Sequence, residues 1–169
     1  RHETFTATRT RSSVTGHMRV GLSADGRILA RETETLVDIG AYCTGGNYLP
    51  GSMLQRLVRL YDIPAERYRG RAVYTNTVPA GAFRGYGSPQ ACFAAESQID
   101  EICDQLGLDP IEFRRQNAWH PGEPHPMILG LKLDTYGLEE CLQKGAERIG
   151  WSKRVKPNTG KGTRKRGIG

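Results

Sequence analysis

The sequence predicts an α+β fold in which an antiparallel β-ribbon layer is covered by two or three packed helices. Apolar and polar residues alternate in the first third of the chain, which is the period of half-buried strands, and later stretches repeat at the helical spacing. A glycine-rich stretch from Thr75 to Gln90 separates the two patterns. The chain has 169 residues, of which 37% are hydrophobic, enough for one domain with a core. We expect that domain over residues 1–152, followed by a basic flexible tail over 153–169.

The β-ribbon is predicted from two runs joined by a turn. Residues 18–22 alternate, Asp25-Gly26 is a hairpin signal, and a second run extends from Ile28 to Ile39. A further run from Arg67 to Thr77 has strand composition around residues 73–75 and leads into the glycine-rich stretch. Because an isolated hairpin is only marginally stable in water, the ribbon needs a layer of helices against it.

Several stretches predict helices. The clearest follows the glycine-rich stretch and ends at Gly107. Its apolar stripe consists of Cys92, Ala95, Ile99, Ile102 or Cys103, and Leu106. Asp109, followed by a proline and then a glutamate, predicts the start of another helix that extends to about Asn117. A shorter helix is expected over 52–60, and a last amphipathic one over 138–149.

The glycine-rich stretch has the composition of a loop that something approaches closely. Gly81, Gly85 and Gly87 allow backbone conformations closed to other residues and carry no side chain. Ser88 and Pro89 are interpreted as the N-cap and first residue of the following helix, whose free N–H groups would face the loop. Such an arrangement binds anions in general. A plain tight turn between a strand and a helix would use the same residues.

Composition narrows the classes of function. The net charge of +6 is partly concentrated in the tail from Lys153 to Arg166, and no nucleic-acid-binding module accompanies it, so no nucleic-acid partner is expected. No apolar run reaches the roughly 20 residues of a membrane span, and no signal peptide is recognisable, so we expect no membrane and a cytoplasmic location. His120 and His125 lie among prolines and are expected in a solvated connector. The cysteines form no close pair and are predicted to be mostly packed thiols: Cys43, Cys92, Cys103 and Cys141.

Two sequence blocks are specific enough to indicate a family. They are TNTVPAGAFRGYGSPQ, from Thr75 to Gln90, and LGLDPIEFRRQNAW, from Leu106 to Trp119. Together they resemble the molybdenum-binding subunit of the xanthine dehydrogenase and aldehyde oxidase family, and the likeness covers most of the chain. The start at Arg1, without an initiator methionine, agrees with a fragment. The resemblance implies a piece of the molybdopterin-binding region of a larger enzyme.

The resemblance also implies roles for individual residues. Those matching Phe83, Arg84 and Gly85 bind the molybdenum–molybdopterin cofactor, and Arg84 does so largely through its backbone, near the metal. Tyr86 matches an aromatic residue, usually Phe, that stacks against the substrate ring; its added hydroxyl needs a partner when buried and leaves the substrate open. Arg56 falls where purine-oxidising members place an arginine that orients the substrate in catalysis, although a solvated helix residue would have the same local pattern.

The function implied is that of a xanthine dehydrogenase-like hydroxylase, which oxidises a purine or related small heterocycle with oxygen from water. Its partners would be the remaining molybdenum-binding domain and the domains or subunits that carry iron–sulfur clusters and, where present, FAD. The alternatives are a family member that acts on an aldehyde, nicotinate or an aromatic substrate, and a noncatalytic assembly module with a basic tail. The fragment alone is expected to be inactive. The glutamates match no general base of the family: Glu32, Glu34, Glu96, Glu101 and Glu112.

Overall fold

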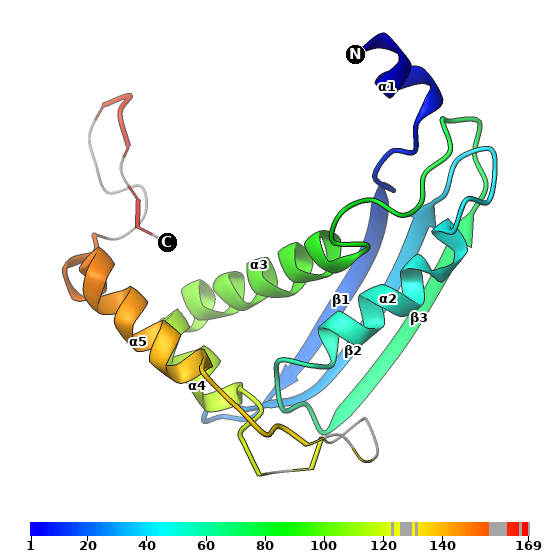
Figure 1. The fold of residues 1–169 in the computed structure, drawn as a ribbon. Coiled ribbons are helices and arrows are strands. Elements are labelled where there is room, and N and C mark those ends of the chain that lie inside the picture. Colours follow the sequence, from blue (N-terminus) through cyan, green and yellow to red (C-terminus); the bar gives the residue numbers. More distant parts are fainter. Residues whose placement is uncertain (123, 126–129, 131, 156–161, 166, 169) are drawn as a thin grey trace.

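A three-stranded sheet with helices packed on one face forms the body of the computed structural model (Figure 1), which describes residues 1–122, 124–125, 130, 132–155, 162–165 and 167–168. In chain order the elements are α1 (His2–Ala7), β1 (Val14–Leu22), β2 (Ile28–Asp38), η1 (Gly46–Tyr48), α2 (Leu49–Leu57), β3 (Ala65–Val73), α3 (Ser88–Leu106), α4 (Pro110–Asn117), α5 (Leu138–Ile149) and η2 (Trp151–Lys153). The α+β class predicted from the sequence is confirmed. Among the described residues, none of the helices combines the length and the apolar composition needed to cross a bilayer.

The sheet contains the predicted antiparallel ribbon and a third strand that runs parallel to its neighbour. β1 pairs with β2 in antiparallel register, and the turn between them places Gly26 at φ 86°. β3 pairs with β2 in parallel, with Ala65 opposite Ala30 and Val73 opposite Asp38, so the sheet is mixed. A parallel partner requires a crossover, and α2 provides it. The strand composition around residues 73–75 therefore marks only the end of β3, because the register with β2 begins at Ala65.

The core lies between the sheet and helices α2 and α3. One cluster of buried residues joins β2, α2 and the start of α3: Val37, Ile39, Leu49, Met53, Leu57, Ala91 and Ala95. A second lies nearer to α4: Ile28, Tyr61, Ile63, Ile99, Cys103 and Phe113. The buried stripe of α3 thus begins at Ala91, whereas the predicted Cys92 and Leu106 are exposed, Leu106 by 58%.

A buried arginine, paired with a glutamate of the sheet, also links the sheet to α2. The Nε of Arg31 lies 3.0 Å from Glu66 Oε2, and the two side chains are only 3% and 1% exposed. Arg31 also donates to the carbonyl of Leu57, at 2.7 Å, near the end of α2. Burial raises the pKa of Glu66, and the Arg31 guanidinium opposes that shift. One arginine therefore links β2, β3 and the helix that crosses between them.

The helix boundaries on either side of residue 108 follow the predicted signals. α3 ends at Gly107, which adopts a left-handed conformation with φ 69°. The carboxylate of Asp109 accepts from the N–H groups of Ile111 and Glu112, at 2.8 and 3.1 Å, as an N-cap should. In contrast, α5 contains no buried residue and is linked to α4 by an ion pair between Arg115 and Glu139.

Two expectations about polar and thiol side chains were wrong. His125 is 5% exposed, lies edge-on to Trp119 with 4.5 Å between the ring centres, and its Nε2 hydrogen-bonds the carbonyl of Val58. The connector therefore folds back onto the residues after α2 rather than extending into solvent. Of the cysteines, Cys103 alone is buried, while Cys43, Cys92 and Cys141 are exposed and all four are free.

Candidate functional site

Three segments that are distant in sequence meet beyond the ends of β2 and β3, near the N-terminal end of the chain (Figure 1). They are residues 9–12, residues 39–48, and the glycine-rich loop, which we define as residues 75–87. The N–H of Gly81 donates to Thr10 at 3.3 Å, and the N–H of Ala80 donates to Ile39 at 3.0 Å. Backbone hydrogen bonds therefore hold the glycine-rich loop on both flanks.

Two glycines in this region have no side chain because the backbone of a neighbouring segment lies where a Cβ would be. A Cβ on Gly40, which has φ 72°, would lie 2.4 Å from the carbonyl oxygen of Val78. A Cβ on Gly81 would lie 2.6 Å from the carbonyl oxygen of Thr44. Both distances are shorter than any real contact of a Cβ, so these glycines are required by the fold itself.

The start of α3 differs from the prediction. Its N-cap is Gly87, with φ 89° and no side-chain cap, rather than Ser88. The Ser88 N–H donates to Gly85 at 2.8 Å, the Ala91 N–H donates to Gly87 at 3.0 Å, and Pro89 has no N–H. Because the N–H groups of Ser88 and Ala91 are bonded within the chain, the helix start offers fewer free donors to an anion than the sequence suggested.

Three exposed donors lie one turn earlier, in the loop itself. Phe83, Arg84 and Gly85 are exposed, and within the described part of the chain no acceptor binds their backbone N–H groups. The Arg84 carbonyl, by contrast, accepts from Nη2 of Arg11 at 2.8 Å. Gly85 has φ 88°, and a Cβ there would lie 2.8 Å from Cδ of Pro89. The loop thus presents a row of three N–H groups from predicted cofactor-binding residues.

Tyr86 finds a partner for its hydroxyl within the chain. The hydroxyl donates to the carbonyl of Gly45, and the ring packs against the core cluster around Val37. Its own carbonyl accepts from Ser52 Oγ at 2.7 Å. Burial raises the pKa of Tyr86, and the nearby Tyr48 and Cys43 add to the shift. Tyr86 is also a non-glycine residue with positive φ, 33°, so its conformation is set by these contacts.

Arg56 lies beside the first turn of α3 rather than in the glycine-rich loop. Its Nε donates to Ser88 Oγ at 2.9 Å, and the side chain is exposed. Ser52, one turn earlier on α2, hydrogen-bonds the loop through its side chain, at the carbonyl of Tyr86. The structure therefore brings Phe83, Arg84 and Gly85 together and places Arg56 at their margin.

Sequence reasoning missed the segment that lies alongside the loop. Arg11 contacts Arg84 and Phe83, and Ser12 accepts from Gln90 Nε2 through its carbonyl at 3.1 Å. Two buried polar atoms here, Ser12 Oγ and Gln90 Oε1, have no hydrogen-bond partner among the residues that the structure describes. Residues 1–16 show no hydrophobic period, so no local signal indicated that they approach a loop some 70 residues later.

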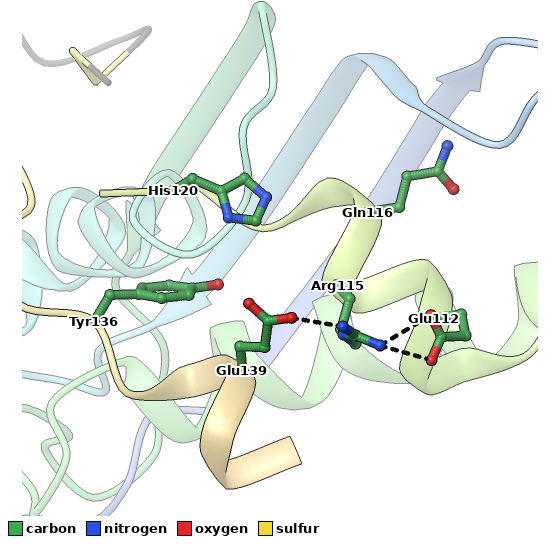
Figure 2. Close-up of a pocket in the computed structure, with 6 residues that line it drawn as sticks. All are labelled: Glu112, Arg115, Gln116, His120, Tyr136 and Glu139. Atoms are coloured by element: carbon green, nitrogen blue, oxygen red, sulfur yellow. Dashed lines mark hydrogen bonds and ion pairs between the residues drawn. The ribbon is translucent and has the colours of Figure 1, made fainter. Parts of the chain in front are cut away.

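A depression lies at the other end of the molecule, between α4 and α5. It has a volume of about 330 Å³ and is lined by Glu112, Arg115, Gln116, His120, Tyr136 and Glu139. Figure 2 shows Arg115 between Glu112 and Glu139, with which it forms ion pairs. The two terminal nitrogens of Arg115 are paired in this way, whereas its buried Nε has no partner among the described residues. In the part of the chain that the structure describes, no group of three or more His, Cys, Asp or Glu side chains could hold a metal ion.

Comparison with known families identifies the class to which this fold and loop belong. Residues 1–118 match the model of the molybdopterin cofactor-binding domain. That stretch includes the sheet, α2, α3, α4 and the whole glycine-rich loop. The chain therefore belongs to the molybdopterin cofactor-binding domain family, as the two sequence blocks indicated.

Its relatives are parts of larger molybdenum enzymes. The chain is 37% identical, over its full length, to the xanthine dehydrogenase molybdenum-binding subunit of Escherichia coli O157:H7, and 35% identical, over 88% of its length, to the nicotinate dehydrogenase large molybdopterin subunit of Eubacterium barkeri. The crystal structure of the aldehyde oxidoreductase from Desulfovibrio desulfuricans superposes with a TM-score of 0.77 and 34% identity over 86% of the chain. The chain spans only 22%, 35% and 16% of these three proteins.

Proposed function

We propose that this chain is the part of a molybdenum hydroxylase that presents the glycine-rich loop to the molybdenum–molybdopterin cofactor. The observation that carries the proposal is the row of unbonded N–H groups on Phe83, Arg84 and Gly85. An exposed backbone donor costs nothing while water binds it, but a cofactor that displaces the water must supply acceptors in its place. In this proposal Arg84 contacts the cofactor near the metal through its backbone.

The residues around the loop fit such a group. A pterin with a dithiolene and a phosphate is rich in hydrogen-bonding atoms, and the loop offers consecutive N–H donors to it. Ser12 Oγ and Gln90 Oε1 are buried and unpaired, which costs free energy unless a ligand or water completes them. Gly85 keeps the loop free of a side chain next to the donors of Phe83 and Arg84.

When bound, the cofactor would supply the two-electron redox chemistry that hydroxylates a carbon with oxygen from water. The chain's own residues hold and orient it. The backbone of residues 83–85 would bind the cofactor, the Phe83 ring stacks with the guanidinium of Arg11, and Tyr86 sets the loop conformation through its hydrogen bond to Gly45. We assign no general base to this chain. Iron–sulfur clusters and, where present, FAD are expected on other domains or subunits of the enzyme.

For the substrate we propose a purine or related heterocycle, bound against Tyr86 and oriented by Arg56. The relatives differ in what their names say they oxidise, namely xanthine, nicotinate and aldehydes, so family members that act on the last two stay as the alternative. A cytoplasmic location belongs to the same proposal and is supported by four free thiols.

The experiment is metal analysis and a substrate panel on the full-length enzyme. We expect close to one molybdenum per protein and turnover of a purine in preference to nicotinate or an aldehyde. Arg84→Ala should retain most of the molybdenum, because the proposed contact is made by the backbone. A full-length protein that contains no molybdenum would favour the noncatalytic assembly module, and loss of most of the metal in Arg84→Ala would reassign the contact to the side chain.

A further inference from the structure

We propose that Arg11 is a positioning residue that holds the glycine-rich loop in the conformation that presents its N–H groups to the cofactor. This inference rests on the proposed function and adds a residue from a segment without any recognisable motif. Arg11 lies 73 positions before Arg84 in the chain, yet its Nη2 is 2.8 Å from the Arg84 carbonyl oxygen. Its guanidinium carbon lies 4.6 Å from the centre of the Phe83 ring.

The hydrogen bond orients a particular donor. The carbonyl of Arg84 and the N–H of Gly85 belong to one planar, trans peptide unit, so they point in opposite directions. Fixing the carbonyl toward Arg11 therefore fixes the Gly85 N–H away from it. Glycine populates both signs of φ with similar ease, so this peptide unit could otherwise turn over at little cost. Arg11 removes that freedom without touching the donor itself.

The contact between the Arg11 guanidinium and the Phe83 ring fixes the residue that precedes Arg84. A guanidinium above an aromatic ring is attracted by the ring face, and the planar group can stack while it donates a hydrogen bond. Arg11 thus holds the Phe83 ring and the Arg84 carbonyl together. These two residues and Gly85 are the proposed cofactor-binding residues, and no acceptor binds their N–H groups among the described residues.

The backbone of Arg11 is itself held against the loop on both sides. Thr10 exchanges hydrogen bonds with Pro79 and Gly81, at 3.2 and 3.3 Å, and the Ser12 carbonyl accepts from Gln90 at 3.1 Å. None of the ion pairs of the described part of the chain involves Arg11, so no carboxylate competes for its guanidinium. The side chain is available for the loop alone.

The test compares Arg11→Ala and Arg11→Lys with Arg9→Ala in the full-length enzyme. Arg9 belongs to the same segment and donates to the Thr44 carbonyl at 3.2 Å, so it is a matched control with no contact to residues 83–85. Three quantities are measured: molybdenum bound per protein, the thermal midpoint, and the electron paramagnetic resonance spectrum of the partly reduced metal. Lysine retains the charge but can neither stack as a plane nor offer the fork of donors.

We expect Arg11→Ala to retain molybdenum about tenfold more weakly than the wild type, the size of effect typical of one charged hydrogen bond, with the thermal midpoint unchanged. Arg11→Lys should fall between the two and show a shifted spectrum in the metal that remains. Arg9→Ala should match the wild type. If Arg11→Ala does not fold, the Arg11→Lys spectrum and occupancy decide.

Normal occupancy and an unchanged spectrum in both Arg11 variants would overturn the inference while the proposed function stands. Equal losses in Arg11→Ala and Arg9→Ala, together with a lower thermal midpoint, would also overturn it, because the segment would then be a general support. A wild-type enzyme without molybdenum would overturn the proposed function first, and the role of Arg11 with it.

Discussion

Where α3 meets α4, the side chains of Asn117 and Arg114 satisfy the polar groups around them, whereas the glycine-rich loop leaves the N–H groups of residues 83–85 unbonded. Asn117 is 3% exposed; it accepts from the N–H of Ile28 at 2.7 Å and donates to the carbonyls of Gly26 and Phe113. Its one amide therefore ties the β1–β2 turn, β2 and α4 together.

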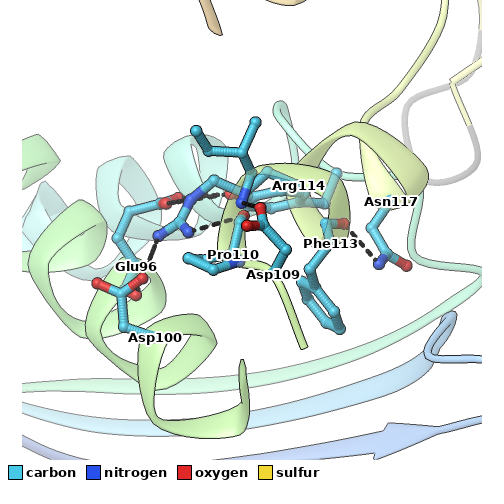
Figure 3. A network of polar contacts seen from close by, with 9 residues as sticks. Glu96, Asp100, Asp109, Pro110, Phe113, Arg114 and Asn117 are labelled. Atoms are coloured by element: carbon cyan, nitrogen blue, oxygen red, sulfur yellow. Dashed lines mark hydrogen bonds and ion pairs between the residues drawn. The ribbon is translucent and has the colours of Figure 1, made fainter. Parts of the chain in front are cut away.

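Arg114 does the same for the two helices (Figure 3). It donates to Glu96 and Asp100 of α3, at 2.8 and 2.9 Å, and to the carbonyl of Pro110 at 3.1 Å. Glu96 in turn accepts from the buried hydroxyl of Tyr61 at 2.8 Å, and burial raises the pKa of Tyr61. Every donor and acceptor named here is used within the chain.

The two regions contain the two sequence blocks that indicated the family, and only the structure distinguishes what each block does. Around residues 106–119 the side chains of Asp109, Arg114 and Asn117 are hydrogen-bonded within the chain, as expected of polar groups that stabilise a fold, although the Nε of Arg115 has no partner among the described residues. Around residues 75–90 the side chains mostly serve the loop's own shape and the backbone donors stay open. Exposed backbone donors beside buried unpaired atoms fit the proposed contact with the cofactor.

The largest effect should come from Asn117→Ala. The change leaves three buried backbone groups without their partner, and at 1–3 kcal/mol for each unsatisfied group we expect a loss of about 4 kcal/mol in the free energy of unfolding. Chemical unfolding of the full-length enzyme measures it, with Gln116→Ala, whose exposed amide binds only Asp25, as the control. Molybdenum per folded protein should not change. If Asn117→Ala lowers the free energy of unfolding only slightly, the α3–α4 junction does not differ from the glycine-rich loop in the way described.

Arg56→Ala tests the proposed substrate-orienting role of Arg56, which lies beside the glycine-rich loop. If Arg56 stabilises charge that develops on a purine during the reaction, its loss should cost about 3 kcal/mol, on the order of a hundredfold in kcat, with cofactor content unchanged. Ser88→Ala removes the hydrogen-bond partner of Arg56 and should have little effect on the rate. Equal losses in both variants would instead mean that the pair only fastens α2 to α3.

Gly85→Ala tests whether the glycine is needed for cofactor binding. Its Cβ would collide with Pro89, so the single variant combines strain with the loss of ligand contact. The double variant Gly85→Ala/Pro89→Ala removes the collision and retains only the unfavourable φ, at about 1 kcal/mol. We expect both variants to remain folded and both to lose molybdenum. Recovery of full occupancy in the double variant would show that the loop glycine serves packing alone.

The smallest effect concerns Asp38, which ties the end of β2 to the loop. Hydrogen bonds from the Thr75 hydroxyl and the Gly40 N–H lower the pKa of Asp38 below its ordinary 3.8. A carboxylate with a lowered pKa stabilises the fold above the unfolded value, and that contribution disappears as the pH falls through the folded value. Asp38→Asn should therefore cost less than about 1 kcal/mol at pH 7, and the cost should shrink as the pH falls through the lowered pKa of Asp38. Thermal unfolding measured across this range should show the two proteins converging in acid.

The α+β class, the β1–β2 turn, the C-terminal end of α3 and the start of α4 follow from the sequence because their causes are local. An apolar period, the Asp109 cap and the left-handed Gly107 each act within a few residues. The residues proposed to bind the cofactor, Phe83, Arg84 and Gly85, were found through their motif, which is also a local feature.

Only the tertiary structure decided which residue caps α3, how β3 pairs and which distant residues contact the glycine-rich loop. Ser88 has the composition of an N-cap, but Gly87 takes that place and Ser88 binds Arg56 instead. The parallel pairing of β3 depends on the crossover of α2, and the contact of Arg11 with Arg84 depends on that crossover and on the register of β1. The physical reason is that contacts between distant positions are selected by packing the whole chain, whereas propensities act on neighbouring residues alone.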